Sequence, residues 1–112
     1  MRLSGSAALK ERALVFAALG DVTRLSVLTK LMSGEPQSIA RLTAGTRLSR
    51  QAVTKHLRVL EGVGVVRGVR AGREALFKLD PRPIDDVRKY LDSVSKQWDD
   101  ALTRLKSFVE GD

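Results

Sequence analysis

The stretch from residue 46 to residue 60, TRLSRQAVTKHLRVL, constrains the fold of this chain more than any other. Ser49 is a good N-cap residue, because its hydroxyl can accept a hydrogen bond from an amide that is otherwise unpaired in the first helical turn. Val53, Leu57 and Leu60 then follow at the i, i+4, i+7 spacing of a buried helical stripe. The spacing predicts an amphipathic helix that starts after Ser49 and packs one side on a core.

The opposite side of this predicted helix carries amide, hydroxyl and cationic groups but no carboxylate. At about 100° per residue it is formed by Gln51, Thr54, Lys55 and Arg58, and the first acidic residue, Glu61, comes only at the end of the helix. An ordinary solvated helix face mixes charges of both signs. This combination instead suits a polyanion that is recognised through hydrogen bonds to its exposed edges. We therefore interpret the segment as a recognition helix.

Residues 65–79, VVRGVRAGREALFKL, indicate two short β-strands around a turn at Ala71-Gly72, with Arg70 and Arg73 flanking the tip. Ala-Gly is a weaker hairpin signal than Asn-Gly, so the alternative is a three- or four-residue loop in which Gly72 has a positive φ. A helix followed by a basic hairpin is the winged helix-turn-helix arrangement. In that arrangement the helix enters a DNA groove and the hairpin reaches the adjacent backbone.

The positive charge of the chain is concentrated on the same segments. The 112 residues have a formal net charge of +7, which favours a polyanionic partner. Residues 47–78 hold eight basic and two acidic side chains, a net of +6, whereas residues 1–46 have a net of +3 and residues 81–112 a net of −1. A generally basic protein would spread this excess, so its location supports contact with double-stranded DNA.

Two helices are predicted at the start of the chain, over residues 6–19 and 22–32, after a frayed end at residues 1–5. Residues 13–19, ALVFAAL, are apolar nearly all round, so the first helix should be buried against its own domain and against a second surface. Asp21 should cap the second helix. The buried stripe of the second helix is expected to consist of Leu25, Leu28, Leu31 and Met32.

A shorter helix over residues 38–44 should follow a turn at residues 34–36. Ile39 and Leu42 would point inward, Gly45 would take the left-handed position at the C-terminal end, and Leu48 would pack where the next helix starts. Two short helices joined by a tight turn form a helix-turn-helix unit, here residues 38–62. The expected fold is therefore mainly α with a small β-hairpin wing, in a single domain over residues 1–112.

Residues 80–83, DPRP, form a stiff break before a long final helix at residues 84–109. Its apolar positions recur in steps of three and four, close to a heptad seam. A small winged domain cannot cover about 38 Å of helix, at 1.5 Å per residue, so we predict a homodimer through the first and last helices. The apolar positions are Ile84, Val87, Leu91, Val94, Trp98, Ala101, Leu102, Leu105 and Phe108.

Several functional classes are not supported by the sequence. It contains no cysteine, which removes disulfides, thiolate metal sites and thiol redox sensing. One histidine and no glycine-rich phosphate loop leave no catalytic set, so we expect neither an enzyme nor a bound cofactor. No signal peptide and no apolar run of roughly 20 residues is present, which predicts a cytoplasmic protein without a membrane partner.

Residues 49–79 resemble the ArsR family of bacterial winged-helix repressors. The family pattern combines a small-residue cap, a valine, a serine or threonine, a histidine-leucine-x-x-leucine run, a glycine-hydrophobic pair, a basic hairpin and an aromatic-x-leucine. Upstream, the segment Leu19-Gly20-Asp21-x-x-Arg24-Leu25 is similar to the opening of the second helix of the family. The matching positions are Ser49, Val53, Thr54, His56, Leu57, Leu60, Gly64, Val65, Gly72, Arg73, Phe77 and Leu79.

This resemblance implies a symmetric dimer on a palindromic operator that usually represses its own promoter. Many relatives release DNA when metal binds to cysteines in the first helix of the helix-turn-helix unit, or to aspartate and histidine on the last helix. Here residues 37–42 contain no cysteine and the last helix contains no histidine. The resemblance therefore favours a metal-independent branch, often encoded beside a START-like ligand-binding protein, and no feature of the sequence identifies an inducer.

The candidate DNA-binding residues fall into two groups. Gln51, Thr54 and Lys55 are candidates for base reading, because Gln can pair with adenine and Lys can donate to guanine. Phosphate contacts, which set affinity and salt dependence, are expected from the arginines. The arginines are Arg50, Arg58, Arg70 and Arg73. Ser49 is expected to cap its helix, with a phosphate contact as an addition.

Other residues have a structural interpretation and a functional one. His56 lies at the edge of the apolar stripe and is expected to pack or to touch a phosphate. The pairs at residues 85–86 and 99–100 would either bind a hard cation or simply solubilise the helix. Trp98 would lie in the dimer seam or beside a ligand pocket. The alternative to a DNA-binding repressor is a winged-helix protein-interaction module that uses the long last helix.

Overall fold

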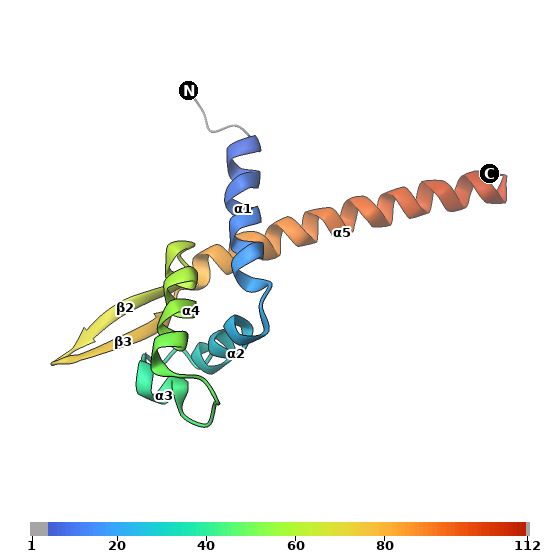
Figure 1. Cartoon of the computed structure of the whole chain (residues 1–112). Coiled ribbons are helices and arrows are strands. Elements are labelled where there is room, and N and C mark those ends of the chain that lie inside the picture. Colours follow the sequence, from blue (N-terminus) through green and yellow to red (C-terminus); the bar gives the residue numbers. More distant parts are fainter. Residues whose placement is uncertain (1–4, 112) are drawn as a thin grey trace.

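The computed structural model describes residues 5–111 and consists mainly of helices with a small three-stranded sheet. Of the expected frayed end, residues 1–4 lie outside the described residues, and Gly5 already belongs to the first helix. The elements in chain order are α1 (Gly5–Leu19), α2 (Val22–Leu31), β1 (Gln37–Ser38), α3 (Ile39–Thr43), α4 (Arg50–Gly62), β2 (Val66–Ala71), β3 (Glu74–Leu79) and α5 (Pro81–Glu110) (Figure 1). The predicted fold class, mainly α with a β-hairpin wing, is confirmed.

The core lies beneath α4, and the predicted apolar stripe of this helix is confirmed. Val53, Leu57 and Leu60 have no exposed surface, and the core continues into Leu31 of α2 and Leu42 of α3. On the short helix α3, Ile39 is partly buried against this core, as expected. The recognition helix is therefore fixed to the body of the protein along its whole inner side.

The wing is built from β2 and β3, and its loop differs from the prediction. The antiparallel register pairs Ala71 with Glu74, so the loop contains only Gly72 and Arg73. Gly72, at the first loop position, has a φ of +64°. Two-residue hairpin loops that begin with glycine require a positive φ at that position. The tip is therefore one residue further along than Ala71-Gly72, and the three- or four-residue loop is wrong.

A third strand, β1, was not predicted. It has only two residues, Gln37 and Ser38, which pair with Phe77 and Leu76 of β3, so the strand order is β1-β3-β2. Ser38 also serves as the N-cap of α3, where its hydroxyl accepts a hydrogen bond from the Arg41 amide. The short strand ties the start of the helix-turn-helix unit to the base of the wing.

The buried side of α2 differs from the predicted one. Asp21 caps the helix as expected, and Leu28 and Leu31 are buried. However, Leu25 is 50% exposed and Met32 is 71% exposed, while Val27 is buried instead. Apolar residues lie on both sides of this helix, and packing against α4 decides which side is covered.

Helix α5 starts three residues earlier than predicted. Residues 80–83 are not a break before the helix, because Asp80 is its N-cap and Pro81 is its first residue. Proline is accepted in a first helical turn, where its missing N–H would have no partner. The Asp80 carboxylate accepts hydrogen bonds from the backbone amide and the guanidinium of Arg82, with an Nη2–Oδ2 distance of 2.7 Å.

These bonds make the stability of the helix start depend on pH. The Arg82 side chain, followed by the Arg82 amide, lowers the pKa of Asp80 to about 2. Because the carboxylate is favoured in the folded state, its contribution is complete above the unfolded pKa of about 3.9 and is lost as pH falls towards 2. We expect Asp80→Asn to lose less stability than the unaltered protein between pH 4 and pH 2. Thermal unfolding across this range measures the difference.

The matched control is Asp99→Asn, because Asp99 is an exposed carboxylate further along the same helix. It should follow the acid profile of the unaltered protein. Identical profiles for Asp80→Asn and the unaltered protein would show that the Asp80 cap does not contribute to acid sensitivity.

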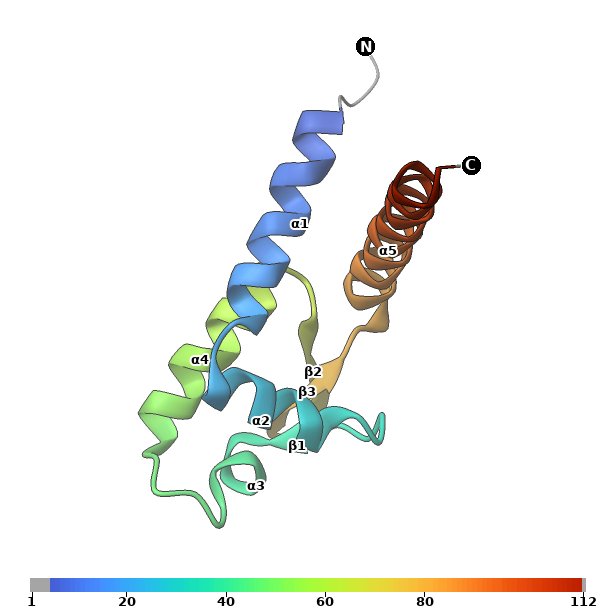
Figure 2. The ribbon, with the colours of Figure 1, turned by 90° about the vertical axis from the view of Figure 1, so that its right-hand side faces the viewer.

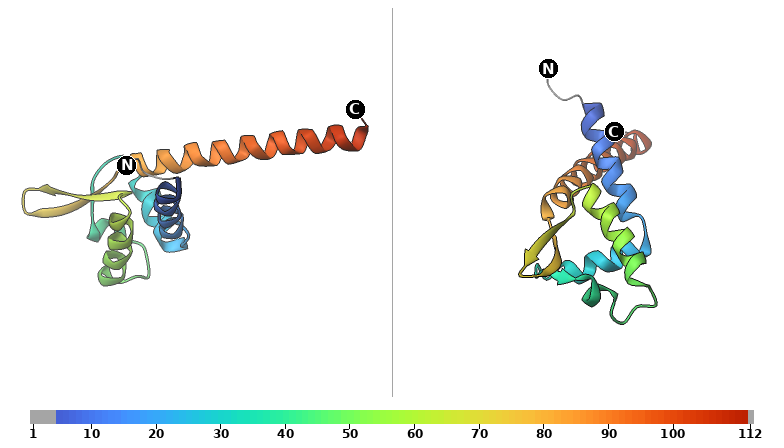
Figure 3. Two further views of the ribbon diagram at one scale, coloured as in Figure 1. Left: turned by 90° about the horizontal axis from the view of Figure 1, so that it is seen from above. Right: turned by 60° about the vertical axis from the view of Figure 1, so that its left-hand side comes forward.

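Helix α5 extends far beyond the body formed by the other elements (Figures 1 and 3). The radius of gyration is 18.9 Å, whereas a compact chain of this length has about 13 Å. The far part of the helix carries Trp98, Leu102, Leu105 and Phe108, which are 65%, 56%, 57% and 83% exposed. Among the described residues, none of the helices is long and apolar enough to cross a membrane.

Helix α1 has one covered side and one open side. Val15 and Ala18 are buried in the core, whereas Leu9 and Leu14 are 49% and 61% exposed. Figure 2 looks along α5 from its C-terminal end and shows α1 beside it. The burial of residues 13–19 against a second surface stays a prediction, because the side of α1 that carries Leu14 is open in the single chain.

Candidate nucleic-acid interface

The outer side of α4 presents the groups that the sequence predicts. Ser49 caps the helix by accepting a hydrogen bond from the Ala52 amide at 3.1 Å. Gln51, Lys55 and Arg50 are exposed on the first turns, and no carboxylate lies in the first turn of the helix. The amino end of a helix also favours an anion, because its amides are unpaired and its dipole is positive there.

Thr54 has a more specific orientation than its sequence position indicates. Its hydroxyl donates to the Arg50 carbonyl oxygen at 2.7 Å, so the hydroxyl hydrogen is directed into the helix. The groups left for a ligand are the methyl group and the acceptor side of the oxygen. Thr54 lines a surface hollow next to α3, together with Ile39, Ser49, Arg50, Gln51, Ala52 and Lys55. The structure therefore places the predicted base-reading residues around one depression.

Arg58 and Arg70 lie on a second hollow, between the later part of α4 and the wing. Arg58 forms an ion pair with Glu61, with an Nη1–Oε1 distance of 3.1 Å, and its side chain is 69% exposed. An exposed pair of this kind contributes little to stability, so the guanidinium can exchange its partner for a phosphate. The carboxylate nevertheless reduces the positive potential beside Arg58 in the free protein.

The wing carries further cations away from α4. Arg73 lies in the two-residue loop at the tip, and Arg67 and Lys78 face each other across the two strands. In Figure 1 the tip points away from the body on the side opposite to α5. Arg73 is therefore separated from the residues of α4, as expected for a group that would reach a neighbouring part of a DNA backbone.

His56 is the predicted site residue that faces the protein rather than the open side of α4. Its Nδ1 lies 3.4 Å from Nη1 of Arg24 and 3.8 Å from Oδ2 of Asp21, both at the start of α2. The packed position is one of its two predicted environments. Arg24 is not among the predicted site residues, although it belongs to the motif at residues 19–25. Arg47, which is exposed in the turn before α4, is not among them either.

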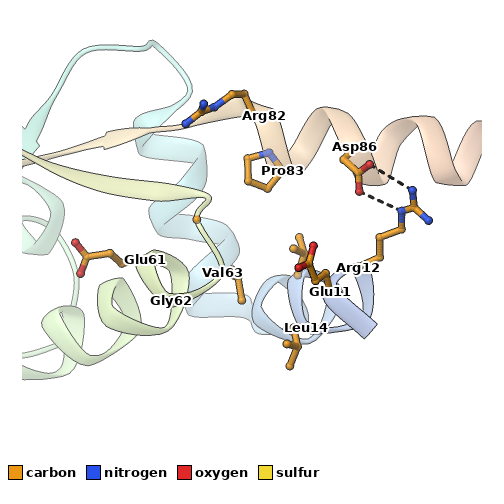
Figure 4. Close-up of a pocket in the computed structure, with 11 residues that line it drawn as sticks. Glu11, Arg12, Leu14, Glu61, Gly62, Val63, Arg82, Pro83 and Asp86 are labelled. Carbon is orange, nitrogen blue, oxygen red and sulfur yellow. Dashed lines mark hydrogen bonds and ion pairs between the residues drawn. The ribbon is translucent and has the colours of Figure 1, made fainter. Parts of the chain in front are cut away.

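Two further depressions involve helices α1 and α5. One lies between α1, the end of α4 and the start of α5, where Arg12 and Asp86 bond to each other at 3.1 Å (Figure 4). The other lies beside Trp98 and is formed by residues of α5 alone. In the part of the chain that the structure describes, no three histidine, cysteine or acidic side chains are grouped so that they could hold a metal ion.

Comparison with known proteins identifies the family. Residues 19–69, from the end of α1 into β2, match the model of a helix-turn-helix domain. The HTH-type transcriptional regulator Rv2034 of Mycobacterium tuberculosis is 32% identical over 95 residues, which is 85% of each chain. An ArsR-like transcriptional regulator from Rhodococcus sp. RHA1 is 35% identical, with a TM-score of 0.80 over 91% of this chain and 95% of that chain.

The chain belongs to the ArsR family of transcriptional regulators. Membership in this ArsR family means that α4 is part of a DNA-binding helix-turn-helix unit and that the protein is a transcriptional regulator, not an enzyme.

A more distant structure supports the fold alone. A possible ArsR-family regulator from Mycobacterium bovis is 21% identical, with a TM-score of 0.66 over 85% of this chain and 89% of that chain. It is described as a homodimeric winged helix-turn-helix DNA-binding domain. The ArsR-family relationship and the shared fold together confirm the winged helix-turn-helix arrangement of α3, α4 and the wing.

Proposed function

We propose that this ArsR-family protein is a sequence-specific repressor that binds a palindromic operator as a homodimer, without a metal-sensing site. The observation that carries the proposal is the outer side of α4, which offers amide, hydroxyl and cationic groups without a carboxylate in its first turn. The cationic wing follows directly in the chain. Residues 1–112 would act as one domain, and an operator on chromosomal DNA would place it in the cytoplasm.

Within this proposal the site residues have separate tasks. Gln51, Thr54 and Lys55 would read base edges in the major groove, where glutamine pairs with adenine, lysine with guanine and a threonine methyl with thymine. Phosphate contacts would come from the arginines at positions 50, 58, 70 and 73. Ser49 would keep its capping role and add a phosphate contact, whereas His56 would remain packed on α2.

The exposed apolar residues of α1 and α5 support the homodimer. Apolar positions on α5 alternate in steps of three and four from residue 84 to residue 108, which is the spacing of a helix-helix seam. In a symmetric dimer the exposed apolar residues of α1 and those of α5 from Leu91 to Phe108 would be covered, whereas Val87 is already buried in the core of the single chain. The two copies of α4 would be about one helical turn of DNA apart. The Mycobacterium bovis protein described as homodimeric has the same fold.

The residues available as metal ligands support regulation without metal. Both family positions for metal lack the required residues, because residues 37–42 contain no cysteine and α5 contains no histidine. Three of the four paired aspartates of α5 are engaged with cations, since Asp85 bonds to Arg88 and Lys89, Asp86 to Arg12, and Asp100 to Lys96. We therefore propose release from DNA by another route, such as a small molecule, a partner protein or a change in protein concentration.

The proposal is tested by a gel-shift titration against about 200 base pairs upstream of the gene, at two salt concentrations. Specific operators are typically bound at least 10³-fold more tightly than other DNA. A discrete complex that resists random competitor DNA would support a repressor and locate its operator. Equal competition by random DNA would show only general basic binding.

Two substitutions separate the predicted tasks of the helix and the wing. Arg73→Ala should weaken binding to all DNA sequences and reduce the slope of log K against log salt by about 1, because one phosphate contact is lost. Gln51→Ala should mainly reduce discrimination at one base pair, by about 1–3 kcal/mol. Titrations of the operator and of single-base variants at several salt concentrations measure both effects. Equal losses on every sequence from both changes would contradict this division.

A second candidate function uses α5 instead of α4. The large exposed apolar residues of its far half would also suit a different protein partner, as in a winged-helix interaction module. Salt-sensitive binding to the upstream DNA distinguishes the two functions. An interaction module would show no preference for that DNA and would remain monomeric until its partner is added.

A further inference from the structure

Two parts of the sequence that the proposed DNA contacts leave unexplained meet at one point in the structure. The first is the start of α2, with Asp21 and Arg24, and the second is His56 in the middle of α4. Nη1 of Arg24 lies 3.4 Å from Nδ1 of His56, although the residues are 32 positions apart in the sequence. The fold therefore brings together one group from each of two separate motifs.

Arg24 also bonds to the end of α1. Its Nε donates to the Ala18 carbonyl at 2.6 Å and its Nη2 to the Ala17 carbonyl at 3.4 Å. Carbonyls in the last turn of a helix have no partner within that helix, and a cation is favoured there by the helix dipole. The planar guanidinium thus joins the end of α1 through two of its nitrogens and faces α4 with the third.

Asp21 caps α2 and fixes the backbone at Arg24. Its carboxylate accepts a hydrogen bond from the Arg24 amide at 2.9 Å, which is the main reason why the pKa of Asp21 is lowered. Because a guanidinium only donates, Nδ1 of His56 is assigned as the acceptor, which leaves the ring proton on Nε2. Three elements, α1, α2 and α4, are therefore connected by one partly buried polar cluster.

This cluster differs in kind from the other contacts of α4. Val53, Leu57 and Leu60 hold the helix on the core, but the burial of apolar surface has no preferred direction. A hydrogen bond does have a preferred direction, and its geometry restricts how far the helix can turn or slide. Helix α1 is one of the two helices proposed to form the dimer, so the cluster lies between the dimer interface and the recognition helix.

We infer that Arg24 and His56 are positioning residues that fix the orientation of α4 relative to α1. The inference rests on the proposed function for its consequence, because a fixed orientation sets the separation of the two recognition helices in the dimer. Without the contact, α4 would remain folded on the core but would sample several orientations. Binding to an operator with fixed half-site spacing would then weaken more than binding to random DNA.

The absence of cysteine from the chain allows the orientation to be measured directly. Spin labels are attached through Lys10→Cys on α1 and Val59→Cys on α4, both exposed positions, and the labelled chain is diluted with unlabelled chain. We expect one narrow distribution of distances between the two labels of a chain. Arg24→Gln and His56→Leu should broaden or shift it, whereas His56→Asn should preserve it, because the asparagine oxygen can replace Nδ1 as the acceptor.

The same variants are then compared in gel-shift titrations. Arg24→Gln and His56→Leu should each lower operator affinity about tenfold and leave binding to random DNA unchanged, and His56→Asn should restore most of the loss. Because Arg24→Gln and His56→Leu break the same contact, the variant with both changes should bind the operator no more weakly than the more affected single variant. Arg12→Gln is the matched control, since Arg12 also joins two helices, and its bond to Asp86 links α1 to α5 and not to α4.

The outcomes are distinguishable. An unchanged, narrow distribution of label distances in both Arg24→Gln and His56→Leu would overturn the inference. An equal loss of operator affinity from His56→Asn and His56→Leu would overturn it as well. Because His56→Leu leaves both bonds of Arg24 to α1 in place, a folding defect of Arg24→Gln would still leave one informative variant. If the unaltered protein forms no operator complex, the proposed function fails, while the distance measurement still decides whether the cluster positions α4.

Discussion

Replacing Trp98 and Leu105 with glutamate should convert the dimer to a monomer and abolish the operator complex. Both side chains are mostly exposed in the single chain, at 65% and 57%, and they lie one heptad apart on α5. Burying a large apolar side chain contributes about 1.5–3 kcal/mol. Since a symmetric dimer buries four such side chains, the loss is roughly 6–12 kcal/mol. A micromolar dimer is held by only about 8 kcal/mol.

Sedimentation equilibrium measures the dimer, and a gel-shift titration measures the operator complex. The matched control is Ser93→Glu with Ser107→Glu, which adds the same charge to the same helix at exposed positions outside the apolar seam. It should remain dimeric and bind DNA. A Trp98→Glu, Leu105→Glu variant that stays dimeric would show that the seam of α5 is not the interface. A monomer with undiminished operator affinity would contradict the palindromic site.

The parts of the fold that were predictable from the sequence depend on neighbours within one or two helical turns. The caps at Asp21 and Ser49 were predictable because a capping side chain bonds to an amide three residues ahead. The left-handed conformation of Gly45, with a φ of +78°, was predictable from its place after a helix. The three buried residues of α4 were predictable from their helical spacing. In each case a local pattern has only one physically acceptable solution.

The parts that were not predictable depend on partners distant in the sequence. Helix α2 has apolar residues on both sides, so periodicity alone could not choose between Val27 and Leu25 for the core. Strand β1 is only two residues long, and its pairing with β3 across some 40 residues leaves no local signal. The sequence predicts a break at Pro81 and Pro83, whereas both lie in the first turn of α5, where proline is accepted.

The candidate site shows the same division. The outer side of α4 was predictable because helical spacing alone places its residues there. The partners of its side chains were not: Glu61 beside Arg58, the inward hydroxyl of Thr54 and Arg24 beside His56 are visible only in the folded chain. The sequence therefore locates the surface that would contact DNA, whereas the structure indicates how that surface is held and how much of its charge is free.

Replacing Leu57 with alanine should lower the free energy of unfolding by about 2–5 kcal/mol, because it leaves a cavity under the recognition helix. Leu57 has no exposed surface and lies between Val53 and Leu60, which are equally buried, so the surrounding core can collapse only partly into the space. Domains of this size are stable by roughly 5–15 kcal/mol, so the loss is a large fraction of the total. Denaturant unfolding at several protein concentrations measures it, because dimer formation adds to the apparent stability.

The matched control is Val59→Ala, two residues further along the same helix, where the side chain is 43% exposed. A substitution at such a surface position usually changes the free energy of unfolding by no more than about 0.5 kcal/mol. Alanine also has a higher helix propensity than valine. If Leu57→Ala costs no more than Val59→Ala, α4 is not anchored through its inner side. If the cost is as expected, the recognition helix cannot leave the core without unfolding the protein, so release from DNA does not occur by detachment of α4 from the core.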